Sequence, residues 1–370
     1  MKLRVKLTLI ALLFSVLFAP NLRAARQSYP EAEGAELTEA EYLEMPLGDR
    51  PIRYRPNWRF EFSNDVFLRS DNFFSAGTSV QKHGPRVDSW DTARGTPAFG
   101  RRLAHAFLPV HATDRSFREA WGIGQVISTP DDIETPTLLP MDIPYSALLA
   151  VTNGWTAFND TKFTGFQWLL GVVGPLALGE EIQKAVHKVT GSPEPQGWDN
   201  QLDNEPVLNF TYMWKRKMVT RKSFDLAFNA GGSLGNWFTL ADSSVELRVG
   251  KNKPGGFLYI PDPIGRSMFY DAALRPDNTK RYTFYVSGVF RTTYMARMLI
   301  LDGSTFRDSH SLRSVRRPLV GQMILGVHYR RLRWGIHTNW WFTTDFIESG
   351  TAVQGDTDVD FGTITVEYRF

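Results

Sequence analysis

The sequence predicts an all-β protein, an antiparallel transmembrane β-barrel of about twelve strands with long extracellular loops and one short helix. Three observations predict it: an export signal, segments in which apolar and polar residues alternate, and a high aromatic content. Aromatic residues make up 13% of the chain, with 26 Phe and 11 Trp, yet the mean hydropathy is only −0.26. Large rings are therefore interleaved with polar residues, as in strands with one lipid face and one wet face.

The N-terminus is typical of a secretory signal. Three basic residues precede an apolar run over residues 7–18, and Ala24 and Ala25 follow as a small-residue end. This run is too short to span a membrane, and no later run reaches the roughly 18 uninterrupted apolar residues that a transmembrane helix needs. We assign residues 1–24 to the signal, residues 25–56 to an N-terminal extension without periodicity, and residues 57–370 to an outer-membrane β-barrel.

Composition excludes several classes of protein. The chain has no cysteine, which rules out disulfides, thiolate metal sites and an anchor on an acylated cysteine. The formal charge of +3 includes four basic residues and no acid in the signal, so the mature chain carries −1. There is no case for a nucleic acid partner.

The alternating segments indicate the number of strands. Candidate strands lie near residues 58–68, 77–82, 119–127, 146–159, 162–173, 204–215, 223–234, 244–251, 282–293, 318–329, 331–343 and 363–370. About twelve strands is an even number, as single-chain bacterial barrels have. The long connections 85–117, 175–203, 253–280 and 301–317, beside a short one at 329–332, predict long loops at one end and short turns at the other. The chain ends in Phe370, an aromatic ending that barrel-assembly machinery reads.

One segment contains a candidate base. Residues 180–189 are rich in Glu, Gln, Lys and Ala, which predicts a short helix. Gln183 and His187 are four residues apart and would leave the same face of it. A glutamine beside a histidine can orient one ring nitrogen while the other works as a base. The alternative is a satisfied structural histidine.

Two other segments are polar. In residues 60–71, alternation turns two phenylalanines outward and Glu61, Ser63 and Asp65 into the lumen. The pair Asn64 and Asp65 could bind a hard cation through oxygen or orient a histidine, and an ordinary lumenal network is the alternative. Residues 124–133 and 142–146 have the composition of turns.

These segments resemble, in order and spacing, the lipid A 3′-O-deacylase family of outer-membrane barrels over nearly the whole mature chain. The most specific match is a series between residues 174 and 205: Gly-Pro, Gly-Glu, Gln-three-His, Gly-Trp-Asp-Asn-Gln and Asn-Glu. The resemblance implies a calcium-dependent carboxylic ester hydrolase that removes the 3′ acyloxyacyl group from lipid A in the outer leaflet. It implies that His187 activates water with Gln183 beside it. It also implies that Asn64 and Asp65 help to build the calcium and histidine environment.

The chain departs from the family pattern at several positions: Ser63, Phe73, Phe74, Ser75, Ser128, Ile143 and Ser146. These changes concern substrate contacts more than the base. Glu194 is the nearest candidate for an acid that the family has shortly after the histidine. No Gly-x-Ser-x-Gly sequence is present, which argues against a serine esterase.

The resemblance sets the remaining expectations. The partners are lipid A or lipopolysaccharide in the outer leaflet and, during insertion, the barrel-assembly machinery, and we expect a monomer in the outer membrane of a Gram-negative cell. Calcium is the expected cofactor. Two alternatives stay open: an acyl-ester hydrolase of the same fold that acts on another lipid, and a passive channel or structural barrel that needs no His187.

Overall fold

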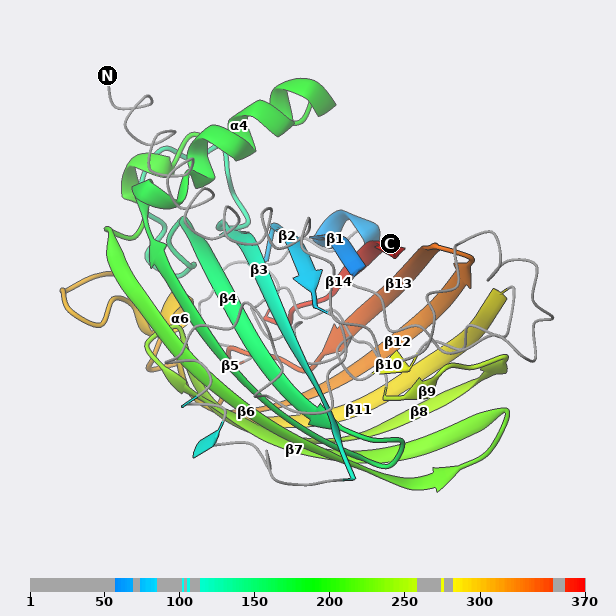
Figure 1. Cartoon of the computed structure of the whole chain (residues 1–370). Coiled ribbons are helices and arrows are strands. Elements are labelled where there is room, and N and C mark those ends of the chain that lie inside the picture. Colours follow the sequence, from blue (N-terminus) through cyan, green and yellow to red (C-terminus); the bar gives the residue numbers. More distant parts are fainter. Residues whose placement is uncertain are drawn as a thin grey trace.

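The computed structural model describes residues 57–68, 74–84, 102, 105–106, 114–257, 274–275, 282–348 and 357–369. Most of these residues form strands that close into a barrel (Figure 1). The barrel strands are β1 (Asn57–Asn64), β2 (Ala76–His83), β3 (Ser116–Ser128), β4 (Ser146–Phe158), β5 (Lys162–Val173), β6 (Glu205–Thr220), β7 (Phe224–Gly235), β8 (Phe238–Lys251), β11 (Tyr282–Met298), β12 (Leu319–Arg331), β13 (Trp334–Thr343) and β14 (Phe361–Arg369).

The remaining elements are short. They are the 3₁₀ turns η1 (Asp65–Leu68), η3 (Pro175–Ala177) and η4 (Trp198–Asn200), the helices α4 (Gly179–Thr190) and α6 (Leu299–Asp302), and a small two-stranded sheet of β9 (Gly255–Gly256) and β10 (Leu274–Arg275). Within the described residues, no helix is long and apolar enough to cross a bilayer. The predicted signal and N-terminal extension lie outside the described residues.

The barrel is a closed antiparallel meander. Neighbours in the sequence are neighbours in the sheet, and β1 closes the circle against β14, with Asn57 opposite Arg369 and Asn64 opposite Gly362. A closed sheet leaves no unpaired backbone edge in lipid, where an unsatisfied backbone group costs several kcal/mol. The twelve-stranded antiparallel barrel predicted from alternation is thereby confirmed.

Strands such as β8 present an apolar face outward and a polar face inward, the reverse of a soluble protein. In β8, Val245, Leu247 and Val249 are exposed while Glu246 and Arg248 are buried. β11 follows the same rule, with exposed and buried residues alternating along the strand. The exposed apolar residues form the surface that lipid covers, and burial by lipid replaces burial in a core.

Three short turns, at residues 159–161, 221–223 and 332–333, lie at the barrel end opposite α4, which we call the turn end. In the turn half of the barrel, the lumen is filled with ion pairs. Lys215 Nζ lies 2.7 Å from Glu246 Oε1. The carboxylate of Asp225 contacts three cations at 2.5–3.0 Å: Lys217, Arg248 and Lys253. Arg59 donates to Glu367 at 2.6 Å.

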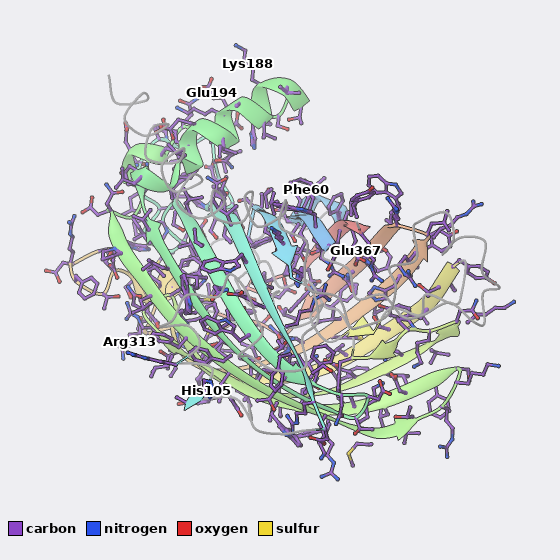
Figure 2. The ribbon with its side chains drawn as sticks, in the orientation of Figure 1. Phe60, His105, Lys188, Glu194, Arg313 and Glu367 are labelled. Carbon is purple, nitrogen blue, oxygen red and sulfur yellow. The ribbon has the colours of Figure 1, made fainter. Side chains whose placement is uncertain are left out.

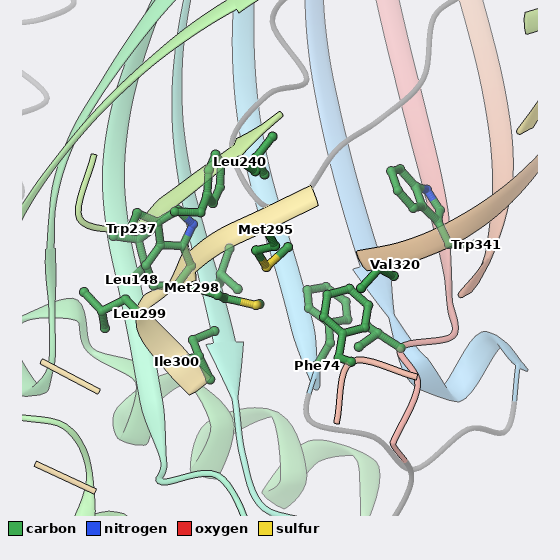
Figure 3. Packing of buried hydrophobic residues seen from close by; sticks show 14 of the residues in the cluster. Phe74, Leu148, Trp237, Leu240, Met295, Met298, Leu299, Ile300, Val320 and Trp341 are labelled. Atoms are coloured by element: carbon green, nitrogen blue, oxygen red, sulfur yellow. The ribbon is translucent and has the colours of Figure 1, made fainter. Parts of the chain in front are cut away.

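In the α4 half, the lumen is filled by apolar side chains instead. All four residues of α6 are buried, and Leu299 and Ile300 pack with Trp237, Leu148 and Met298 in one cluster (Figure 3). The cluster continues to the other wall of the barrel, where Val320, Phe74 and Trp341 belong to it. This packing differs from the polar, water-filled lumen of a porin.

The connections do not sort by length as the sequence analysis predicts. Residues 174–204 and 299–318 are long connections at the α4 end, but the long connections 84–115 and 252–281 join strands at the turn end. Successive connections of a meander must alternate between the two ends. The position of a loop in the order of strands therefore decides its end, and its length does not.

The first strand is shorter than predicted. β1 ends at Asn64, and Asp65 begins η1, so the predicted strand over residues 58–68 is wrong in its last four residues. The backbone N–H of Val66 donates to Asn64 Oδ1 at 3.0 Å and to Asp65 Oδ1 at 2.8 Å. These local bonds offer the backbone a turn in place of the sheet ladder. Asp65 therefore does not face the lumen as a strand residue, although Glu61 and Ser63 are buried as predicted.

Candidate active site

The predicted helix is present as α4, one residue longer at each end than residues 180–189. Glu180 and Glu181 lie in its first turn and His187 and Lys188 in its last, the arrangement that opposes the helix dipole. The helix ends at Gly191, whose φ of 74° is left-handed and whose N–H donates to His187 O at 2.8 Å. Glycine adopts this conformation with the least strain.

Glycines allow α4 to lie directly on the barrel wall. A Cβ at Gly179 would come within 2.5 Å of Ala147 in β4 and of the Trp198 ring. Gly174, before η3, has a φ of 98°, and a Cβ there would come within 2.6 Å of the Asp203 backbone. In addition, Gln125 of β3 donates to Ala177 O at 2.6 Å. The Gly-Pro and Gly-Glu parts of the motif therefore fix the start of α4 against β3 and β4.

Gln183 is held by the motif tryptophan. It is buried, and its Oε1 accepts a hydrogen bond from Trp198 Nε1 at 2.8 Å. The carbonyl oxygen of the amide is thereby engaged, which leaves the N–H₂ group as the donor of this side chain. Sequence reasoning identified Gln183 as the group that orients the histidine, but its hydrogen bond goes to Trp198.

His187 is oriented by the backbone. Its Nδ1 lies 2.6 Å from Pro193 O. A carbonyl oxygen only accepts, so Nδ1 must carry the proton and the neutral ring keeps its lone pair on Nε2. Pro193 O reaches the ring because the chain reverses direction after Gly191. In this reversal the Ser192 N–H donates to His187 O at 3.1 Å. The half-buried ring therefore has the tautomer that a general base needs.

Glu194 does not serve as the partner of the ring in this arrangement. Its side chain is exposed, and the neighbouring carbonyl of Pro193 takes the position at Nδ1. Figure 2 shows Glu194 and Lys188 on the side of the α4 connection that is turned away from the strands. The predicted acid is thus replaced by a backbone acceptor.

The Gly-Trp-Asp-Asn-Gln series supports helix α4 through ring packing and hydrogen bonds. A Cβ at Gly197 would come within 2.5 Å of the Tyr145 ring, and that ring packs 4.9 Å from the Trp198 ring. Tyr145 donates to Ile133 O at 2.9 Å, and Asn200 Nδ2 donates to Pro136 O at 2.7 Å. Burial is the main cause that raises the pKa of Tyr145 to about 12, so the phenol stays a donor. The turn segments 129–145 and 191–204 therefore form one unit.

Asn64 and Asp65 form a second group at the same end of the barrel. Their Oδ1 atoms accept from the single Val66 N–H, so two side-chain oxygens converge on one point. Asn64 Nδ2 donates to Ser75 O at 2.7 Å, and Ser75 Oγ lies 2.6 Å from Thr129 Oγ1. Ser75, which sequence reasoning treats only as a departure from the family, ties this group to the end of β3.

The two groups share the outer wall of the barrel. Asn64 pairs with Ala76, Ala76 with Ile127, and Ile127 with Ala147, in one row across β1 to β4. Directly paired residues point to the same face, and Ile127 and Ala147 pack with Trp198 beneath α4. Three strand spacings of about 4.8 Å put Asn64 about 14 Å from Ala147. The predicted residues thus lie outside the lumen, at one rim.

The oxygen donors fit a hard cation in type. An amide oxygen and a carboxylate are ligand types that calcium prefers, and in this structure Oδ1 of Asn64 and Oδ1 of Asp65 both accept from Val66 N–H. Among the described residues, however, no group of three or more His, Asp or Glu side chains gathers at one point.

A comparison with known protein families shows which family this chain belongs to. The family model described as outer membrane protein LpxR matches residues 10–370. The chain belongs to the LpxR family. It is therefore an outer-membrane protein, in agreement with its barrel and its lipid-facing surface.

One solved structure agrees with this chain in fold. LpxR from Salmonella typhimurium is similar with a TM-score of 0.64 and 15% identity, covering 85% of this chain and all of that one. The beta domain of the Bordetella autotransporter BrkA reaches 0.38 at 9% identity, over 85% of this chain and 98% of that one. A KdgM porin reaches 0.36 at 6% identity, over 85% and 99%. Curated proteins gave no significant match.

Proposed function

We propose that this LpxR-family chain is a lipid A 3′-O-deacylase that hydrolyses the 3′ acyloxyacyl ester with water activated by His187. The observation that carries the proposal is the bond between His187 Nδ1 and Pro193 O, because it leaves Nε2 as a base. Family membership supports a deacylase of this kind. The position of α4 at the rim supports a substrate that resides in the outer leaflet.

The chemistry needs no covalent intermediate. His187 Nε2 takes a proton from water while the water oxygen attacks the carbonyl carbon of the ester. The tetrahedral intermediate then collapses, the bond to the 3′ oxygen breaks, and the imidazolium returns its proton to that oxygen. The products are a free acyloxyacyl acid and a 3′ hydroxyl. An ester suits this mechanism better than an amide, whose leaving group is poorer.

Gln183 has a distinct part in this proposal. Since Trp198 fixes its carbonyl oxygen, its N–H₂ group is held one helical turn from His187 as a hydrogen-bond donor. A fixed donor beside the base can orient water or substrate oxygen without reorganisation during the reaction. This assignment replaces the idea that Gln183 holds the imidazole.

Calcium would be held by Asn64 and Asp65, together with ligands that the side chains near Ser75 supply. When bound, calcium would stabilise negative charge on the carbonyl oxygen of the ester. The residues of this chain would bind and orient that ion at the outer wall, on the same face as the base.

The apolar lumen at the α4 end favours an enzyme over a passive channel, since packed side chains of α6 and its neighbours occupy that half of the barrel. An ester hydrolase for another lipid is the second candidate, because the chain departs from the family pattern at Ser128 and Ile143. Lipid A and the assembly machinery as partners, and the monomeric state, remain predictions.

The deciding experiment is mass spectrometry of lipid A from a Gram-negative host with and without the protein. We expect loss of the mass of the 3′ acyloxyacyl group, with amide-linked chains retained. Released fatty acid from glycerophospholipids beside unchanged lipid A would favour the second candidate. Absence of acyl release from any lipid, with the barrel correctly inserted, would contradict both.

A further inference from the structure

Helix α4 carries an exposed apolar stripe that plays no part in its attachment to the barrel. Ile182, Val186 and Val189 are spaced four and three residues apart, so they line one side of the helix. Their exposed fractions are 41%, 51% and 88%. In a surface helix such positions normally face the protein core.

Around the helix axis, the stripe lies beside the face that holds α4, and it extends farther toward the C-terminal end of the helix. That face contains Gly179 and Gln183, which are buried against Ala147 and Trp198. At 100° per residue, Val186 lies nearly opposite Lys188 around the helix axis. The apolar stripe therefore lies next to the packed face and away from Lys188, and it stays exposed.

The apolar stripe continues a surface that lipid already covers. α4 connects β5 to β6, and the exposed Leu170 and Leu208 of these strands belong to the lipid-facing side of the barrel. Leu176 in η3 is exposed between Leu170 and the helix. The helix itself lies on the outer wall and extends away from the strands (Figure 1).

We propose that α4 is an interfacial helix whose Ile182, Val186 and Val189 lie among the acyl chains of the outer leaflet. Continuity with the lipid-facing strands identifies the occupant of the stripe as lipid rather than a second copy of the chain. On the other side, Lys188 would sit at the anionic headgroups, which attract basic side chains. An amphipathic helix with this division of residues lies in the plane of the interface. Its depth would set the height of His187 in the membrane.

The absence of cysteine permits a direct depth measurement. Val186→Cys and the matched control Lys188→Cys would each carry a thiol-reactive environment-sensitive fluorophore, in nanodiscs that hold one barrel. The discs would be of phosphatidylcholine, with or without bromine on the acyl chains. We expect the probe at 186 to be quenched by bromolipid and protected from aqueous iodide, and the probe at 188 to show the opposite.

Two results would overturn the proposal. Equal iodide quenching at 186 and 188 would place the stripe in water. Protection of the probe at 186 from both quenchers would mean that protein covers it. Folding of each variant is checked by gel mobility of unboiled samples. If Val186→Cys does not fold, Val189→Cys provides a second labelling position on the stripe. The measurement needs no hydrolysis, so its outcome is independent of the proposed function.

Discussion

The lumen and the α4 connection both contain histidines, and the two environments differ in how many ring nitrogens form hydrogen bonds. In the lumen, His328 Nδ1 lies 3.1 Å from His337 Nδ1, its Nε2 lies 2.9 Å from Ser287 Oγ, and its ring stacks on Tyr285. At the α4 end, His187 Nδ1 bonds to a backbone carbonyl, its Nε2 has no hydrogen bond within the described part of the chain, and the ring is half-exposed. A histidine with both nitrogens engaged supports structure, whereas one with a lone pair at a rim can work as a base.

The partners also differ in their distance along the chain. Lumenal contacts join residues such as Ser287 and His328, which are 41 positions apart and meet because β11 pairs with β12. The ring of His187 is held by a residue six positions away. The orientation of the His187 ring is therefore specified by one local segment, while the lumenal contacts depend on the pairing of strands. Changes in the lumen should accordingly reduce stability, and changes at the rim should reduce turnover.

The largest expected effect on stability is at Asp225. Asp225→Asn removes the carboxylate shared by Lys217, Arg248 and Lys253, and breaking a buried ion pair costs about 3–5 kcal/mol. Unfolding in guanidinium, followed by gel mobility, should shift to lower concentration while turnover per folded barrel stays constant. Asp203→Asn is the control, because Asp203 is 70% exposed in its pair with Arg307. Equal stability of the two variants would contradict the lumenal role.

The next effect concerns calcium at the rim. Chelation should stop hydrolysis, and Asp65→Asn should raise the calcium concentration needed for half-maximal turnover while leaving unfolding unchanged. Loss of one stabiliser of the oxyanion costs roughly 10²- to 10³-fold in rate. Asp132→Asn is the control, since within the described residues Asp132 accepts hydrogen bonds from Glu134 and Thr135 of its own turn. Full turnover in excess chelator would refute calcium involvement.

A smaller effect is expected on kcat, and it should differ between variants of two tryptophans. Trp198→Phe removes the donor to Gln183 Oε1, and one hydrogen bond is worth about 0.5–1.5 kcal/mol. We expect up to roughly a tenfold fall in kcat if the amide moves freely. Trp155→Phe is the matched control, because the buried Trp155 Nε1 has no hydrogen-bond partner in the described structure. A similar loss in both variants would mean that only ring volume matters.

The smallest effect is faster proteolysis of the connection 174–204 at alkaline pH, where Tyr145 begins to ionise. The pKa of Tyr145 is raised from 10 to about 12 mainly by burial, so its contribution to stability is complete below pH 10 and is lost as pH rises toward 12. Limited proteolysis of residues 174–204 should accelerate between pH 8 and pH 11 in the wild type. Tyr145→Phe should lose this acceleration, whereas the exposed control Tyr294→Phe should keep it. Parallel behaviour of all three proteins would rule out Tyr145 as the cause.

Sequence patterns predicted what depends on local periodicity. The alternation in residues 282–291 gave both faces of β11, and the composition of residues 180–189 gave α4. The end of β1 was missed because the competition between the sheet and the Asn64 and Asp65 side chains is decided by two hydrogen bonds. No periodicity reports such a bond.

The arrangement of the site was beyond sequence reasoning for a different reason. Asn64, Ala76, Ile127 and Ala147 share one row only in the observed register of four strands. A shift by one residue would move them to the lumenal face. Similarly, the bond from His187 Nδ1 to Pro193 O depends on a backbone reversal after Gly191. Every residue has a backbone carbonyl, so residue types do not indicate which one will accept.

The central claim is that His187, and no lumenal histidine, is the base. It is tested most directly by turnover of purified lipid A by His187→Ala and His328→Gln, each normalised to barrel that is folded by gel mobility. General-base catalysis contributes about 10²- to 10⁴-fold, so His187→Ala should lose that much of the 3′ acyl release. His328→Gln should fold less stably and keep near wild-type turnover. Near wild-type turnover in His187→Ala would make His187 structural and contradict the account.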